Sequence, residues 1–375
     1  MIYLDNAATS YKKPDCVLRT TCRALYKNSA NPGRSGHDLS VAAGEILYDT
    51  RKSLAKLFNV ENPERIVFAH NTTDALNKGI KGILSCGGHV ITTSMEHNSV
   101  IRPIKALEKK GVTHSIWTAN ERGELDFSKL EKLIKRETKL IVMTHASNVC
   151  GNIYDIKKAA EIAHKNNVLL MVDAAQSAGS IDIDCSDIDL LAFPGHKGLM
   201  APMGSGGLYV KECIKIRPII EGGTGSVSES LTQPDFFPDM LESGTLNVPA
   251  IAGLGKACEF ISSVGAENIG KHEAALRRAF EEKIKNIKNI KVYGSENKCG
   301  ICAFNIADLD CVEVAQILND DFKICVRAGL HCAYLAHKTL KTQNRGLIRA
   351  SFGFFNTQKD VDVLADAVYK LSKNV

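Results

Sequence analysis

The sequence VLLMVDAAQ at residues 168–176 carries the clearest structural signal in the chain. Its first five residues are all apolar, without the alternation of apolar and polar residues that a half-exposed strand shows. Asp173 follows them directly, and Gln176 comes three residues later. A continuous apolar run of this length is typical of a strand buried on both faces, as in a parallel sheet covered by helices. The stretch therefore predicts a central strand that ends in polar side chains.

Similar apolar runs recur on both sides of this strand and alternate with segments of helical periodicity. The other expected strands are residues 65–69, 89–93, 139–144, 190–193 and 207–210, and the expected helices are residues 73–84, 99–110, 128–137 and 155–166. Alternation of this kind predicts an α/β domain with a parallel sheet covered by helices. We expect the following stretch, Gly222–Asn247, to form a long irregular loop.

The chain of 375 residues is too long for a single hydrophobic core, so we expect two domains. After residue 256 the strand–helix alternation ends and an α+β pattern replaces it. Its expected helices are 256–289, 311–320 and 357–373, and its expected strands are 301–306 and 346–351.

Composition and charge exclude several classes of protein. Hydrophobic residues make up 44% of the chain, and the net charge is only +5 with the charges interspersed, so we expect no nucleic-acid or membrane-surface partner. No uncharged apolar stretch reaches 18 residues, and the first residues lack the basic and apolar regions of a signal peptide. Twelve cysteines without an export signal indicate free thiols in a reducing cytoplasm.

Two short motifs do not support the functions that their composition suggests. The glycine-rich stretch Met203–Gly207 leads into an expected strand, whereas a dinucleotide site requires a helix N-terminus at that point. Cys299 and Cys302 form a CxxC pair with no second pair, and zinc would require two more ligands. We therefore expect structural thiols and no metal site.

Polar residues follow the strands at the ends where an open parallel sheet binds ligands. Asn71-Thr72-Thr73 opens a helix whose N–H groups suit a phosphate, although either threonine is equally plausible as a plain helix cap. His97 suits stacking on a planar ring or a surface position at a helix start. Asp173 requires a charged partner if it is buried, and Lys197 lies in a glycine-rich loop.

One cofactor uses all of these groups together. Pyridoxal phosphate (PLP) requires a lysine for its Schiff base, a carboxylate for its pyridine nitrogen and hydrogen-bond donors for its phosphate. The shared placement of these residues at strand ends favours PLP, although their spacing alone does not name the cofactor.

The chain resembles the class V aminotransferase family of fold-type I PLP enzymes, and within it the cysteine desulfurases and selenocysteine lyases. The motifs that carry the resemblance occur in order along almost the entire chain: 3–10, 72–75, 96–98, 147–149, 173–176, 195–197, 242–247 and 349–352. The resemblance implies a large PLP-binding domain over residues 16–255 with a mostly parallel seven-stranded sheet. Residues 1–15 and 256–375 then form a small α+β domain that carries a cysteine loop.

The resemblance also implies a role for each matching residue. Lys197 forms the Schiff base, Asp173 pairs with the pyridine nitrogen and His97 stacks on the ring. The other implied cofactor contacts are Thr72, Thr73 and His196 at the phosphate, Thr245 at the phosphate of the partner subunit in a homodimer, and Gln176 and Asn148 near the phenolic oxygen. Arg349 binds the substrate carboxylate in a bidentate manner, which suits a planar guanidinium. Asn148, Arg327 and His331 are further substrate-side residues, and Asn31–His37 resembles a substrate-side loop.

The motif Arg327–Ala333 resembles the loop that carries the sulfur-accepting cysteine of the short-loop desulfurases. Cys332 is therefore the one cysteine of twelve that we predict to be catalytic, whereas without the family it would be read as a small core residue. Three departures from the family pattern are Pro194, where a hydroxyl for the phosphate is usual, Leu330 and Tyr334. They bear on the phosphate contacts and on the shape of the cysteine loop.

The predicted function is that of a PLP-dependent L-cysteine desulfurase that forms L-alanine and a persulfide on Cys332 for transfer to a sulfur-acceptor protein. Two alternatives stay open. The first is a selenocysteine lyase or another class V PLP reaction on a small amino acid. The second is a non-catalytic sulfur carrier or scaffold subunit, which has no need to keep Lys197, Asp173 and Arg349 together.

Overall fold

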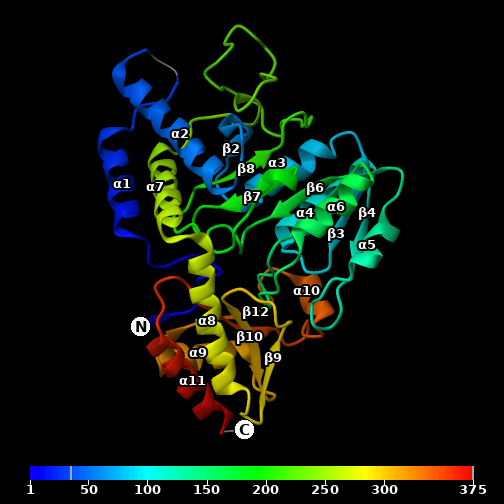
Figure 1. Ribbon diagram of the computed structural model, residues 1–375, viewed down its shortest axis with the longest axis vertical. Helices are drawn as coiled ribbons and strands as arrows, with labels where there is room; N and C mark the ends of the chain where they lie inside the picture. Colours follow the sequence, from blue (N-terminus) through cyan, green and yellow to red (C-terminus); the bar gives the residue numbers. More distant parts are fainter. Residues whose placement is uncertain (34–35, 374–375) are drawn as a thin grey trace.

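A seven-stranded sheet forms the centre of the larger part of the molecule (Figure 1). The computed structural model describes residues 1–33 and 36–373. In spatial order the strands are β2 (Ile66–Phe68), β8 (Gly206–Val210), β7 (Leu190–Pro194), β6 (Leu169–Asp173), β5 (Thr138–Thr144), β3 (Gly88–Thr93) and β4 (Val112–Trp117). Only β8 runs against its neighbours. The predicted mostly parallel α/β sheet is therefore confirmed.

The edge strand β4 was not among the strands expected from the sequence. Its sequence VTHSIW mixes polar and apolar residues, and its middle residues are partly accessible to solvent. An edge strand has a neighbour on one side only and does not require a continuous apolar run. The six expected strands, by contrast, all occur within two residues of their predicted bounds.

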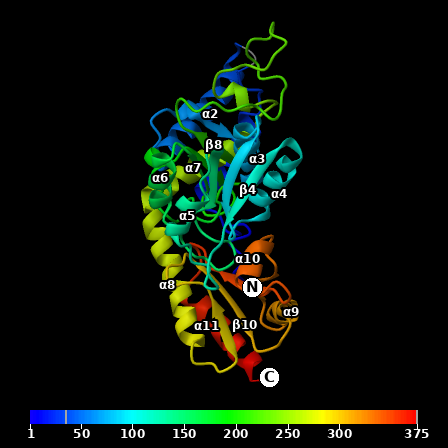
Figure 2. The same cartoon turned by 90° about the vertical axis from the view of Figure 1, so that its right-hand side faces the viewer.

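Helices cover both faces of the sheet (Figures 1 and 2). One face packs against α3 (Thr72–Ile83) and α4 (Asn98–Leu107). The other face packs against α2 (Asp38–Leu57), α5 (Phe127–Leu133), α6 (Ile156–Lys165) and α7 (Val248–Val264), with α1 (Asp15–Lys27) lying on α7. Along β6, Leu170 and Val172 face one helix layer and Met171 faces the other, because side chains alternate across a strand.

A second, antiparallel sheet lies at the opposite end of the molecule (Figure 2). Its strands are, in order, β12 (Arg327–Gly329), β13 (Leu347–Ser351), β10 (Ile301–Ile306) and β9 (Ile290–Tyr293). The helices of this part are α8 (Ala266–Ile284), α9 (Cys311–Asp320), α10 (Tyr334–Thr339) and α11 (Gln358–Ser372). The chain start joins it, because β1 (Ile2–Tyr3) pairs in parallel with β11 (Ile324–Cys325).

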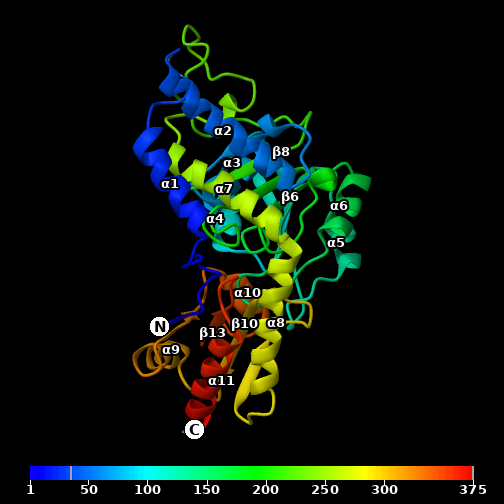
Figure 3. The ribbon, with the colours of Figure 1, turned by 60° about the vertical axis from the view of Figure 1, so that its left-hand side comes forward.

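The helical stretch expected at 256–289 is two helices, and the first of them begins earlier. The break falls at Gly265, whose φ of 89° lies in the region that favours glycine. Before the break, α7 packs against α1 and α2 of the large part, and after it α8 packs against α11 (Figure 3). We therefore propose that the chain passes between the domains at Gly265 and not at the expected residue 255.

The stretch Gly222–Asn247 projects from the large part near the top of Figure 1 and contains one short 3-10 helix, Asp239–Leu241. Within the described residues, no helix is long and apolar enough to cross a membrane.

Candidate active site

The strand ends of the large sheet border a cavity into which eight of the predicted residues face. These residues are Thr72, Thr73, His97, Asn148, Asp173, Gln176, His196 and Lys197. They lie at the carboxyl end of β6 or in the segments that follow β2, β3, β5, β6 and β7. Residues that are far apart in the sequence therefore meet because parallel strands end at the same edge of a sheet.

The start of α3 offers hydrogen-bond donors to this cavity. Asn71 caps the helix by accepting a hydrogen bond from the backbone N–H of Asp74 at 3.0 Å, so neither threonine is the cap. The N–H groups of Thr72 and Thr73 lie in the first turn, where a helix attracts anions. The hydroxyl of Thr73 lies 2.7 Å from the hydroxyl of Ser99 at the start of α4.

His196 offers a further group to the same cavity. Its Nδ1 atom is buried and has no hydrogen-bond partner among the described residues. Burial and the neighbouring Lys197 lower the pKa of His196 to about 4, so the ring is neutral at physiological pH. A buried polar atom without a partner is costly, which indicates that a ligand group belongs beside it.

Asp173 and Lys197 face the cavity from the ends of adjacent strands. Asp173 is 2% exposed and accepts a hydrogen bond from the N–H of Ala175 at 2.9 Å. Burial raises the pKa of Asp173, and the charge of Lys197 counteracts this. Burial lowers the pKa of Lys197 to about 8, although Asp173 favours its charged form. The site therefore holds a nucleophilic amine and a carboxylate that requires a cation.

His97 is held as a neutral ring by its role as the cap of α4. Its Nδ1 accepts a hydrogen bond from the N–H of Ser99 at 3.1 Å. Burial, and then the charge of Lys197, lower the pKa of His97 to about 4. Ser99 thus contacts both His97 and Thr73, a role that the sequence analysis did not assign. Its only sequence signal is its position two residues after His97.

Arg349 reaches the site from β13 of the small domain. It is 1% exposed, and its Nη1 donates to the carbonyl oxygen of Asn148 at 2.8 Å. Its Nη2 donates to Asp5 at 2.7 Å. Asp5 lies in the opening motif of the chain, but the sequence analysis gave it no role. Gln176 also contacts this segment, since its Nε2 donates to the carbonyl oxygen of Ala7 at 3.0 Å.

The loop of Cys332 is anchored to the large domain by two hydrogen bonds. The N–H of Asn98 donates to the carbonyl oxygen of Cys332 at 2.7 Å, and Nδ2 of Asn148 donates to that of His331 at 2.8 Å. The thiol is exposed, and Nη2 of Arg327 lies 3.9 Å from its sulfur. His331 is buried, and its pKa lies well below the ordinary value because of that burial. Arg327, and not His331, is therefore the cation beside the thiol.

Two other predicted groups lie apart from the cavity. Thr245 is exposed in the loop before α7 and does not line the cavity of its own chain. Of the expected substrate-side loop 31–37, Arg34 and Ser35 lie outside the described residues.

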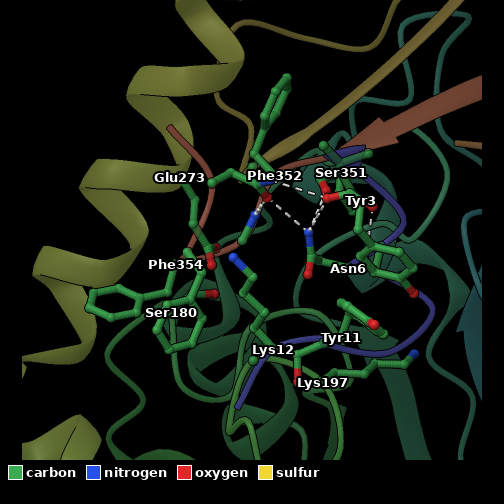
Figure 4. Close-up of a pocket in the computed structure, with 18 of the residues that line it drawn as sticks. Tyr3, Asn6, Tyr11, Lys12, Ser180, Lys197, Glu273, Ser351, Phe352 and Phe354 are labelled. Atoms are coloured by element: carbon green, nitrogen blue, oxygen red, sulfur yellow. Dashed lines mark hydrogen bonds between the residues drawn. The ribbon is translucent and has the colours of Figure 1, made fainter. Parts of the chain in front are cut away.

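A second cavity of about 490 Å³ adjoins Lys197 from the side of the chain start (Figure 4). Lys197 and Gln176 border both cavities. Its wall includes Glu273 of α8. Burial raises the pKa of Glu273 to about 8. This space gives the lysine a second accessible side.

The fold and the residues at the strand ends are those of one class of protein, and comparison with known sequences identifies the same class. Residues 2–364 match the family described as Aminotransferase class-V, and the chain belongs to that family. The predicted family is thereby confirmed.

Relatives within this family share a more particular description. A protein of Methanothermobacter thermautotrophicus named probable cysteine desulfurase is 34% identical, over 99% of this chain and 94% of its own. A cysteine desulfurase of Wigglesworthia glossinidia brevipalpis is 32% identical, over 100% and 93%. The apo structure of a cysteine desulfurase from Thermococcus onnurineus NA1 superposes with a TM-score of 0.94 at 33% identity, covering 100% of this chain and 95% of the other.

Proposed function

We propose that the protein is a PLP-dependent L-cysteine desulfurase that forms L-alanine and leaves the substrate sulfur as a persulfide on Cys332. The observation that carries this proposal is the position of the exposed Cys332 thiol. It lies on a loop that Asn98 and Asn148 hold at the same strand ends as Lys197. The description of the relatives as cysteine desulfurases supports the same reaction.

The cavity fits PLP by the chemistry of its donors. The first turn of α3 and the partnerless Nδ1 of His196 suit the phosphate, and the buried Asp173 suits a protonated pyridine nitrogen. Lys197 would hold the cofactor covalently and the neutral ring of His97 would stack on it. When bound, PLP supplies an electron sink for the bonds of the substrate α-carbon.

Arg349 and Lys197 orient the substrate and move its proton. Arg349 would bind the substrate carboxylate, since its Nε atom is buried and has no partner in the part of the chain that the structure describes. Asn148 holds this guanidinium from the other side through Nη1. Once released by the substrate amine, Lys197 accepts the α-proton, and its lowered pKa keeps a share of the amine neutral for that role.

Cys332 then receives the sulfur. Its thiolate attacks the sulfur of the substrate, a sulfur–sulfur bond forms and the bond between that sulfur and the β-carbon breaks. The electron pair of the broken bond is protonated at the β-carbon and Lys197 returns the proton to the α-carbon, so that L-alanine leaves and Cys332 carries a persulfide. Arg327 stabilises the attacking thiolate by its charge.

The alternatives differ in what they require of this site. A scaffold subunit would not require Lys197, Asp173 and Arg349 to converge, and their convergence supports an enzyme. Selenocysteine would fit the same groups, so the choice between it and L-cysteine rests on whether Cys332 is required.

Partners and location are further parts of the proposal. The exposed persulfide implies a sulfur-acceptor protein. Large apolar side chains exposed on α1 and α2, among them Leu25 at 64% and Tyr26 at 89%, support a homodimer. All twelve cysteines are free within the described chain, which suits a reducing compartment such as the cytoplasm.

The decisive experiment compares Cys332→Ala with the wild-type holoenzyme. The variant should still change the cofactor absorbance on addition of L-cysteine, but it should form little alanine and carry no persulfide. Cys86→Ala is the matched control, because Cys86 is an exposed thiol like Cys332 but borders neither cavity, and it should be dispensable. Near wild-type turnover of L-cysteine by Cys332→Ala would overturn the proposal. Turnover of selenocysteine alone by this variant would favour the lyase.

A further inference from the structure

A chain of three buried polar side chains lies directly behind the cysteine loop. Nδ1 of His331 lies 3.3 Å from Nε2 of His337, and Nδ1 of His337 lies 2.9 Å from the hydroxyl of Thr342. The three residues are 4%, 0% and 4% exposed. None of them has a place in the reaction described above, although His331 immediately precedes Cys332.

The hydrogen bonds select one tautomer for both histidines. The hydroxyl of Thr342 also reaches the carbonyl oxygen of His337, at 3.4 Å, and donates its proton there. It therefore accepts from Nδ1–H of His337, which leaves Nε2 of His337 to accept from Nδ1–H of His331. Nε2 of His331 is then left without a proton.

The surroundings of His331 favour this arrangement. Burial first, and then the charges of Arg349, His337 and Arg327, lower the pKa of His331; a backbone hydrogen bond with Arg327 only partly opposes this, so the ring stays neutral. The guanidinium charges of Arg349 and Arg327 favour a lone pair over an N–H group at Nε2 of His331. Nε2 of His331 is buried and has no partner among residues 1–33 and 36–373.

The ring of His331 is attached to a backbone that requires support. His331 and Cys332 have φ angles of 49° and 55°, a left-handed conformation that costs free energy in residues other than glycine. Their carbonyl groups accept the hydrogen bonds of Asn148 and Asn98. A fixed ring at His331 therefore helps to keep two consecutive strained residues, and with them the thiol, in place.

We propose that His337 and Thr342 are positioning residues for sulfur transfer, which hold His331 in one neutral tautomer and thereby fix the backbone of Cys332 against the large domain. The inference rests on the proposed function, in which Cys332 accepts sulfur. It assigns these two residues no contact with substrate or cofactor.

The test combines a tautomer measurement with a rate. In holoenzyme labelled with ¹⁵N-histidine, NMR should show His331 and His337 protonated at Nδ1. The isosteric variant Thr342→Val removes the acceptor, so both rings should populate the other tautomer. Single-turnover formation of the Cys332 persulfide, followed by intact-protein mass spectrometry, should slow by about tenfold. The KM for L-cysteine should change by less than about twofold, because Arg349 is untouched.

Conservative and matched variants separate positioning from a general loss of structure. Thr342→Ser keeps the hydroxyl, and His337→Gln keeps both an acceptor and a donor. Both variants should therefore form the persulfide at close to the wild-type rate, unlike Thr342→Val. Thr339→Val is the control, since its hydroxyl only donates to the carbonyl oxygen of Leu335 on the same helix. Bound PLP, measured by absorbance, verifies that each variant is folded.

Two outcomes would overturn the inference while the wild-type enzyme forms a persulfide. One is an unchanged histidine tautomer in Thr342→Val, and the other is a wild-type rate of persulfide formation in that variant. A wild-type holoenzyme that forms no persulfide on Cys332 would instead remove the proposed function.

Discussion

At the scale of single residues, the site is governed by the competition between burial and charge. Burial raises the pKa of Asp173 and lowers that of Lys197, and each partly offsets the shift of the other. A second buried carboxyl, Glu96, follows β3 close to this pair, and its pKa is raised to about 8 mainly by burial. The charge of Asp173 adds to that rise. These groups yield two predictions.

Lys197 should be the residue that binds PLP. Borohydride reduction of the holoenzyme followed by peptide mapping should label Lys197 alone. The rate at which apoprotein takes up PLP should increase with pH around a midpoint near 8, because the neutral amine is the nucleophile. Label on another lysine, or a midpoint near the ordinary lysine value of 10.5, would contradict this assignment.

Glu96→Gln should remove a pH dependence of stability. The folded pKa of Glu96, about 8, lies above its ordinary value of 4.5, so its contribution to stability is full below pH 4.5 and is lost as the pH rises through 8. Glutamine keeps the oxygen that accepts from Thr93 and from the N–H of Thr144. Denaturant titrations should show that the variant is more stable than wild type at pH 9. The prediction would be refuted if the difference in unfolding free energy between the two proteins were the same at pH 6 and pH 9.

Among the elements, the starts of two helices form the end of the candidate site at which we propose that the cofactor binds. Asn71 caps α3 and His97 caps α4, and Ser99 contacts a side chain at each start. The helix starts thus combine donors for an anion with a neutral ring. This arrangement follows from two strands, β2 and β3, whose carboxyl ends open at the same edge of the sheet.

Thr73→Val should weaken PLP binding and leave the fold intact. The substitution is isosteric and removes one hydroxyl, whose hydrogen bond to a charged phosphate is worth about 1.5–3 kcal/mol. Equilibrium dialysis of PLP should therefore give a dissociation constant at least about tenfold higher. Thr113→Val on the exposed edge strand β4 is the matched control. An unchanged dissociation constant in Thr73→Val would remove the hydroxyl from the phosphate site.

In the molecule as a whole, the candidate site lies where two bodies meet, and most of their buried side chains belong to two different clusters. The large body provides Lys197 and Asp173, and the small one provides Arg349 and the loop of Cys332. The N-terminal strand β1 belongs to the small sheet region, which brings Asp5 to Arg349. Cys332 and Arg349 contact the large body through Asn98 and Asn148.

The protein should be a homodimer in which Thr245 contributes to the partner's phosphate site. Light scattering should give twice the chain mass, and Thr245→Ala should retain PLP less well, by about 1.5–3 kcal/mol for one hydrogen bond to a charged group. Thr113→Ala serves as the control. A monomer with full PLP occupancy would exclude shared sites.

The central sheet and the order of the site motifs could be predicted from the amino-acid sequence. Buried strands such as 168–173 are visible in the sequence because both faces require apolar side chains, and the polar residues after them lie at one edge by the geometry of parallel strands. The edge strand β4 was not predicted, because an edge strand does not require apolar side chains on both faces.

The contacts between side chains that are far apart in the sequence became visible in the folded structure alone. The pairing of Asp5 with Arg349 joins residues 344 positions apart, and no local periodicity encodes it. The neutral state of His331 depends on burial and on Arg349 and Arg327, which lie on other strands, so the sequence could suggest a cation there but the fold removed its charge. The proposed boundary at Gly265 likewise rests on which helices α7 and α8 pack against. Local patterns report the burial of an element, whereas long-range contacts and charge states depend on how the elements are packed together.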